Sequence, residues 1–134
     1  MEIAESVSKE SYATRLKVGA VIVKDDRGIA HGYNGTISGA SNECEHLVGD
    51  EMKTKDEVIH AEMNALMFVA RSTSSSQGTT LYCTHAPCVN CAKHLIQAGI
   101  VAVVYTNSYR NTDGLDLFIH SGVSVHQHTE ERKE

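Results

Sequence analysis

Hydrophobic residues in the first half of the chain follow two spacings, one typical of helices and one typical of strands. Residues 2–13 carry a loose apolar face at helical spacing, and residues 60–71 carry a second one. Two runs rich in β-branched residues, 18–23 and 29–33, flank the turn-forming residues 25–28, which predicts a β-hairpin. We therefore expect a helix, an antiparallel hairpin and a second helix.

The second half of the chain alternates between short apolar runs and helical segments. Pro87 stands where a helix would begin and Gly99 where that helix would end. The expected elements are a strand at 81–84, a helix at 87–97, a strand at 101–105, a helix at 115–120 and a strand at 123–126. Because short strand–helix–strand connections place neighbouring strands in parallel, the pattern predicts an α/β fold with a mixed five-stranded sheet covered by helices.

Residues 34–55 show little periodicity and contain three glycines among polar residues. Such a segment is expected to be a long irregular loop, and long loops within small domains commonly carry function.

Length and composition describe an ordinary water-soluble domain. With 134 residues the chain is expected to form one domain, residues 1–134. The longest uncharged apolar stretch, residues 100–105, is too short to cross a membrane, and Glu2 and Glu5 near the N-terminus do not resemble a signal peptide. We expect a cytoplasmic protein without a membrane partner.

The net charge of −5 argues against a long nucleic acid as partner, because such partners are held through many phosphates. A mononucleotide needs only one or two well-placed cations, so this class of ligand stays open.

Two short segments contain residues that can bind a metal. Cys88 and Cys91, three positions apart at a helix start, project their sulfurs from one face of the first turn, where the helix dipole favours thiolates. His60, at the start of the preceding helix, can supply a third ligand. Two thiolates and one imidazole suit zinc, and three protein ligands leave a fourth position for water, as catalytic sites require.

Glu62 lies two residues after His60 and is expected beside the water rather than on the metal. A zinc ion with two thiolates and a neutral imidazole is formally neutral, so it should acidify water less than a site with three histidines does. A nearby carboxylate would compensate by accepting the proton.

Each segment alone has a less specific interpretation. A lone His-x-Glu is typical of a surface helix, and a lone Cys-x-x-Cys also fits a structural zinc or a redox pair. A structural zinc would need a fourth ligand, for which Cys83 is the main nearby candidate. The two segments together, each at a helix start, favour a catalytic zinc.

This pairing of segments is the signature of zinc deaminases. Over nearly its whole length the sequence resembles the cytidine/deoxycytidylate deaminase family, and within it the deoxycytidylate branch. The resemblance rests on residues 15–23 (RLKVGAVIV), 32–35 (GYNG), 60–65 (HAEMNA), 87–93 (PCVNCAK), 97–100 (QAGI) and 103–105 (VVY).

The resemblance implies a three-layer α/β/α cytidine-deaminase-like fold and hydrolysis of dCMP to dUMP and ammonia, which would supply dUMP for thymidylate synthesis. It implies that His60, Cys88 and Cys91 bind Zn²⁺. It also implies that Glu62 takes a proton from the attacking water, gives it to ring N3, and later helps to protonate the departing ammonia.

The resemblance also implies substrate contacts. The main chain of Ala61 would help to fix the pyrimidine, Asn34 would hydrogen-bond the sugar or the base, and Tyr109 would lie near the phosphate. Arg15 and Lys17 flank the entry to the first strand and are the cations that we expect at the phosphate. The alternative is that both are ordinary solvent-exposed side chains at the end of a strand, with no role in binding.

Regulation and assembly are further implications of the resemblance. The family commonly has proline two residues after the Asn-Gly pair, in a loop associated with a dCTP or dTTP effector and Mg²⁺, whereas this chain has Ile37 there. Isoleucine does not pre-set a turn as proline does. Cys44, Glu45 and His46 are the candidates for an accessory zinc site, with an unligated loop thiol as the favoured interpretation. A homo-oligomer, with a hexamer as one form, is also implied.

Three other functions compete. A tRNA adenosine deaminase shares the metal signature, but it must hold a polynucleotide and should have a basic surface. A deaminase of free cytidine typically has Cys where this chain has His60. A catalytically inactive zinc module would have no need of Glu62.

Overall fold

The computed structural model of the protein describes residues 1–108 and 111–129. Its elements in chain order are α1 (Glu2–Ser8), β1 (Gly19–Lys24), β2 (Arg27–Tyr33), β3 (Glu45–Val48), β4 (Glu51–Thr54), α2 (Ala61–Ala70), β5 (Thr80–His85), α3 (Val89–Gln97), β6 (Ala102–Asn107), α4 (Asp113–His120) and β7 (Ser124–Gln127).

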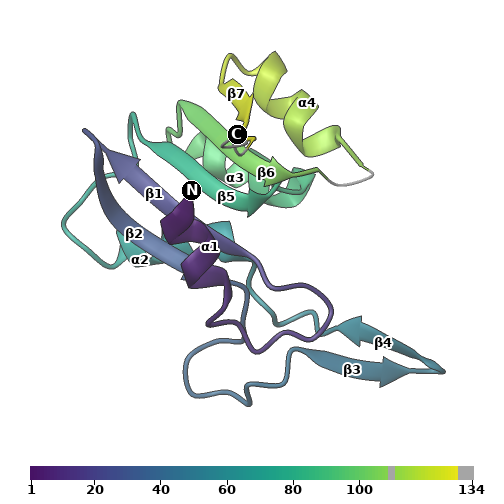
Figure 1. The fold of residues 1–134 in the computed structure, drawn as a ribbon. Coiled ribbons are helices and arrows are strands. Elements are labelled where there is room, and N and C mark those ends of the chain that lie inside the picture. Colours follow the sequence, from purple (N-terminus) through teal and green to yellow (C-terminus); the bar gives the residue numbers. More distant parts are fainter. Residues whose placement is uncertain (109–110, 130–134) are drawn as a thin grey trace, which may run out of the picture.

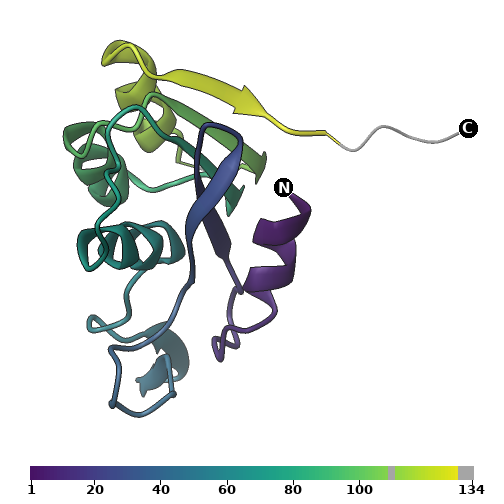
Figure 2. The same ribbon diagram turned by 90° about the vertical axis from the view of Figure 1, so that its left-hand side faces the viewer.

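The main sheet has five strands in the order β2-β1-β5-β6-β7. Strand β1 runs antiparallel to β2 and β5, whereas β5, β6 and β7 are parallel to one another. Helices α2, α3 and α4 lie on one side of this sheet and α1 lies on the other (Figures 1 and 2). The mixed sheet and the three layers expected from the sequence are confirmed.

The hydrophobic core lies between the sheet and the three helices on one side. Ile22, Leu81, Val103, Leu95 and Phe118 are all completely buried there. These residues come from three neighbouring strands and from α3 and α4, and α2 adds Leu66 and Val69, so the core ties all three helices to the sheet.

One glycine sets how closely helix α2 approaches the sheet. A Cβ atom on Gly32 would lie 2.6 Å from the carbonyl oxygen of Ala61 and 2.5 Å from the backbone nitrogen of Ala65. Any side chain at this position would push α2 away from β2, and the first turn of α2 would move with it.

The strand directions bring distant segments to one edge of the sheet. Gly19 at the start of β1 pairs with Tyr33 at the end of β2, and Ala20 pairs with Cys83 near the end of β5. The segment before β1, the segment after β2 and the segment between β5 and α3 therefore meet at this edge. Functional residues of α/β proteins commonly gather where strands end in this way.

Two sequence-based expectations are wrong. The first helix ends at Ser8 instead of reaching residue 13, and residues 9–18 belong to no helix or strand. Residues 34–55 include the hairpin β3–β4, which extends away from the body of the protein (Figure 1). Seven of the eight hairpin residues are exposed, so no alternation between buried and exposed positions marks these strands in the sequence.

In the part of the chain that the structure describes, no helix has the length and apolar character needed to cross a membrane.

Candidate metal centre and adjoining pocket

The expected metal ligands lie at the N-termini of two neighbouring helices. His60 caps α2 and Cys88 caps α3, both with extended backbone, and Cys91 lies in the first turn of α3. The residue before the N-cap of α2, Ile59, is held by two main-chain hydrogen bonds to Gly35, 2.8 and 3.1 Å long, which fix the start of α2. Residues 28 positions apart in sequence thus come together because both helices open at the same edge of the sheet.

The three ligand atoms are spaced as a zinc site requires. His60 Nδ1 lies 3.2 Å from Cys91 Sγ and 3.6 Å from Cys88 Sγ, and all three atoms lie within 4.8 Å of one another. Nitrogen and sulfur ligands on one tetrahedral zinc ion stand about 3.5 Å apart. The donor set therefore fits Zn²⁺, and it contains three ligands, as catalytic zinc sites do.

The two thiols of the site differ in pKa, and only the pKa of Cys88 is lowered. Hydrogen bonds from Cys91 and His60 lower the pKa of the Cys88 thiol to about 3, so that it is a thiolate. The hydrogen bond to Cys88 also raises the pKa of His60, and the same neighbouring thiolate, together with burial, raises the pKa of Cys91. Thiolates are the form in which cysteine binds zinc.

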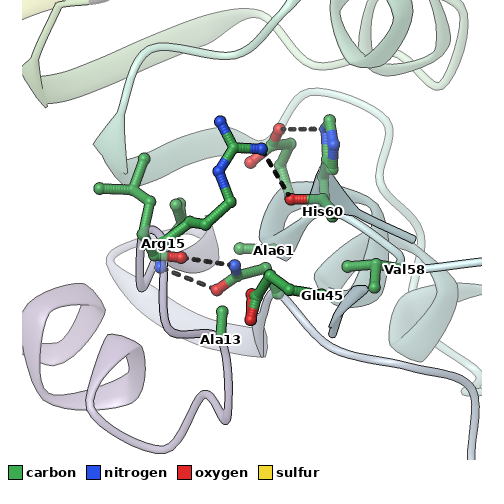
Figure 3. Close-up of a pocket in the computed structure, with 11 residues that line it drawn as sticks. Ala13, Arg15, Glu45, Val58, His60 and Ala61 are labelled. Carbon is green, nitrogen blue, oxygen red and sulfur yellow. Dashed lines mark hydrogen bonds and ion pairs between the residues drawn. The ribbon is translucent and has the colours of Figure 1, made fainter. Parts of the chain in front are cut away.

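Glu62 is the buried acid of this centre. Its side chain is 5% exposed and its Oε1 atom lies 4.0 Å from His60 Nδ1 (Figure 3). Burial raises the pKa of the Glu62 carboxyl, which brings it closer to neutral pH. A carboxylate with a raised pKa beside a metal site is suited to receiving and returning a proton.

A pocket opens next to the metal ligands. Its walls come from the start of α2, from the segment before β1, from Asn34 and from the base of the β3–β4 hairpin. The lining residues are Ala13, Arg15, Leu16, Val18, Asn34, Glu45, Thr54, Val58, His60, Ala61 and Glu62 (Figure 3). Five of the residues predicted to act in catalysis, metal binding or substrate binding therefore line one cavity.

We call residues 13–18 the strap; they form the second part of the connection from α1 to β1, and Ala13, Arg15, Leu16 and Val18 among them line the pocket. Asn34 holds the strap from one side. Its Nδ2 donates to the carbonyl of Leu16 at 2.7 Å, and its Oδ1 accepts from the backbone N–H of Val18 at 2.8 Å. The Asn34 amide is thus engaged with the main chain, and its contact with substrate stays a prediction.

The other expected substrate residues have different positions. Arg15 points into the pocket and donates from Nη1 to Thr54 Oγ1 at 3.3 Å (Figure 3). Lys17 is exposed and does not line the pocket; it lines a neighbouring surface groove formed by residues 9–17, which shares Ala13, Arg15 and Leu16 with the pocket. Tyr109 lies outside the described residues.

The remaining cysteines do not join the metal group. Among the described residues, His60, Cys88 and Cys91 are the ones gathered closely enough to hold a metal ion. Cys83 is fully buried and its thiol donates to the carbonyl of Val104, while burial raises its pKa. Cys44 is also buried, and neither a fourth ligand at the centre nor an accessory site on residues 44–46 is found within the described ranges.

Sequence reasoning missed the pocket wall formed by residues of the segment 34–59. Glu45, Thr54 and Val58 all line the cavity. The sequence indicates Glu45 only as a candidate metal ligand. The one sequence signal for a role of Glu45 in the pocket is an acidic side chain in a long segment of the kind that commonly carries function.

The protein-family model named cytidine and deoxycytidylate deaminase zinc-binding region matches residues 1–107 of this sequence. The chain belongs to this family. Its expected ligands His60, Cys88 and Cys91 lie in the matched region.

Several relatives support the assignment to this deaminase family. The deoxycytidylate deaminase of Enterobacteria phage T4 is 34% identical, over 93% of this chain and 86% of its own length. The ComE operon protein 2 of Bacillus subtilis is 42% identical over 87% of this chain, which spans 62% of that protein. The crystal structure of the dCMP deaminase of cyanophage S-TIM5 in complex with dCMP and dUMP superposes with a TM-score of 0.89 at 44% identity, covering 95% of this chain and 92% of that one.

We predict that this deaminase-family chain binds one zinc ion and that Cys88→Ala and Cys91→Ala each lose it, because each removes one of three ligands. Metal analysis of the purified proteins measures this. Cys83→Ala is the matched control, since it removes a buried thiol outside the cluster and should retain zinc. Full zinc content in both ligand variants would exclude the thiolates as ligands.

Proposed function

We propose that the protein is a zinc-dependent deaminase that hydrolyses dCMP to dUMP and ammonia. The observation that carries this proposal is a pocket lined by Arg15, His60 and the buried Glu62 carboxylate, beside which His60 forms a zinc-type donor set with Cys88 and Cys91. The similarity to deoxycytidylate deaminases of phages, one of them in complex with dCMP and dUMP, supports the choice of substrate. The whole of residues 1–134 is proposed to act as one deaminase domain.

The chemistry follows from the positions of the chain's own groups. Zinc, when bound by His60, Cys88 and Cys91, lowers the pKa of water and supplies a nucleophile at neutral pH. Glu62 stands beside His60, where its carboxylate can accept the proton of the attacking water and deliver it to ring N3. The oxygen of this water adds at C4. Glu62 then takes the proton of the new C4 hydroxyl group and passes it to the amine, so that the C4–N bond breaks, ammonia leaves and C4 keeps a carbonyl oxygen.

The protein environment of Glu62 favours this shuttle. The carboxyl group is almost fully buried, so bulk water does not compete for its proton. The main-chain groups of Ala61 at the N-terminus of α2 lie next to it in the pocket wall and are proposed to fix the pyrimidine.

We predict that Glu62→Gln retains zinc and fold but loses nearly all turnover. The amide preserves size and removes the proton acceptor, and general acid–base catalysis contributes about 10²- to 10⁴-fold. Ammonia release from dCMP, measured together with zinc content and melting temperature, gives the result. Turnover within a few-fold of the parent would remove Glu62 from the mechanism.

Arg15 is proposed to bind the 5′-phosphate. Its guanidinium forms no ion pair with an acidic group among residues 1–108 and 111–129, so its charge is available to a ligand. Lys17, the alternative, lines a different groove. Tyr109 is also proposed to lie near the phosphate, and this proposal rests only on the resemblance to the family.

We predict that Arg15→Ala lowers kcat/KM for dCMP by about 10- to 150-fold, the value of a charge-assisted contact, and leaves deoxycytidine unaffected. The nucleoside has no phosphate to lose. Lys24→Ala, at the opposite end of β1 from the pocket, is the control, and Lys17→Ala tests the alternative cation. An equal decline on both substrates would make Arg15 structural.

Two rival activities are compared with dCMP deamination, and one of them, the deamination of tRNA adenosine, shares the metal signature. A tRNA adenosine deaminase needs a basic surface for its polynucleotide, and the net charge of −5 disfavours it. Ammonia release from dCMP, cytidine and a tRNA anticodon stem separates these activities directly.

Assembly and regulation are proposed from the resemblance to the family. We propose a homo-oligomer, with a hexamer as one form, that acts in the cytoplasm and responds to dCTP or dTTP with Mg²⁺ despite Ile37 in the loop after Asn34. Sedimentation velocity should reveal a mass above that of the monomer, and ammonia release from dCMP, measured with and without dCTP and Mg²⁺, should depend on the effector. A monomer whose turnover is insensitive to dCTP would refute both.

A further inference from the structure

The strap that carries Arg15 is held in place mainly by side chains. The backbone N–H of Ala13 donates to Ser11 Oγ at 3.1 Å, and the N–H of Val18 donates to the Asn34 amide. Neither end of the strap is part of a helix or strand. The position of Arg15 over the pocket is therefore decided by whichever groups bind its neighbours.

Glu45 binds the residue next to Arg15. Its carboxylate accepts the backbone N–H of Thr14 at 2.9 Å on Oε1 and at 3.1 Å on Oε2, and Oε1 also accepts the Thr14 hydroxyl at 3.0 Å. Glu45 is only 8% exposed, and its side chain turns toward Ala13 in the pocket wall (Figure 3). Hydrogen bonds to an ionised group are the stronger kind, so this is the firmest attachment of the strap.

The same end of the hairpin also holds Arg15 itself. Glu45 on β3 pairs in register with Thr54 on β4, and the Thr54 hydroxyl accepts from the Arg15 guanidinium. Two consecutive strap residues are thus bound by two paired residues at the base of β3–β4. Glu45 accepts hydrogen bonds from Thr14 and forms no ion pair with Arg15. The positive charge of the Arg15 guanidinium is therefore available to a ligand.

We propose that Glu45 is a positioning residue for substrate specificity: through Thr14 it fixes Arg15 where the 5′-phosphate of the nucleotide binds. This inference rests on the proposed function, in which Arg15 binds that phosphate. It gives the β3–β4 hairpin a role in selecting a nucleotide over a nucleoside, although most of the hairpin lies outside the pocket.

The test compares dCMP and deoxycytidine as substrates of the zinc-loaded full chain. Glu45→Ala removes the attachment of Thr14, and kcat/KM for dCMP should fall by about 3- to 10-fold, less than in Arg15→Ala because Arg15 is displaced and not removed. The loss should appear in KM with kcat nearly retained, because the phosphate is remote from the reacting carbon. Deoxycytidine turnover should stay within 2-fold of the parent, a limit of about 2-fold being the usual scatter of such comparisons.

Two further variants protect the test against misfolding. Glu45→Gln keeps the size and one acceptor oxygen, so it should restore part of the dCMP preference. Thr14→Val removes only the hydroxyl contact and should have an intermediate effect. Glu51→Ala, which removes an exposed acid from the same hairpin, is the matched control and should behave as the parent.

A double-mutant cycle with Arg15→Ala isolates the coupling. If Glu45 acts through Arg15, adding Glu45→Ala to Arg15→Ala should cause no further loss on dCMP. Equal losses on both substrates, or full additivity in the cycle, would overturn the proposal and leave Glu45 a structural residue. A parent enzyme without preference for dCMP, or an Arg15→Ala variant that keeps it, would instead refute the phosphate assignment on which the proposal rests.

Discussion

His60 Nδ1 lies within 3.6 Å of both Cys88 Sγ and Cys91 Sγ only because helices α2 and α3 begin at the same edge of one sheet. The arrangement of the strands imposes this constraint, since β1 runs antiparallel to both β2 and β5. Gly32 completes it by allowing α2 to lie directly against β2. The thiolate character of Cys88 and the burial of Glu62 both follow from this meeting of two helix N-termini.

The pocket wall formed by residues 13–18 is held in place in a different way. Residues 13–18 belong to no regular element, so their polar backbone groups need partners elsewhere. Asn34 supplies two of them and Glu45 another, and these side chains come from segments 16 to 31 positions away. A single substitution at Asn34 or Glu45 can therefore alter the position of residues 13–18. The metal ligands, in contrast, are held by helices that pack on the hydrophobic core.

The charges of the site explain how an acidic protein can receive an anionic substrate. The chain carries a net charge of −5, and the pocket itself contains Glu45 and Glu62. Glu45 accepts hydrogen bonds from Thr14, and burial raises the pKa of Glu62. Neither carboxylate forms an ion pair with Arg15. A single free guanidinium suits one phosphate group and offers little to a polynucleotide, which requires many such contacts.

The sequence by itself determined the metal chemistry and the order of the elements. His60, Cys88 and Cys91 stand at helix starts with ligand spacing, and β-branched runs mark the strands of the buried sheet, so local pattern carries this information. Only the tertiary structure decided that the first helix ends at Ser8, that residues 45–54 form a hairpin, and that Glu45 binds Thr14. The physical reason is that an exposed hairpin leaves no hydrophobic pattern in the sequence, and a hydrogen bond between residues 31 positions apart exists only once the chain is folded.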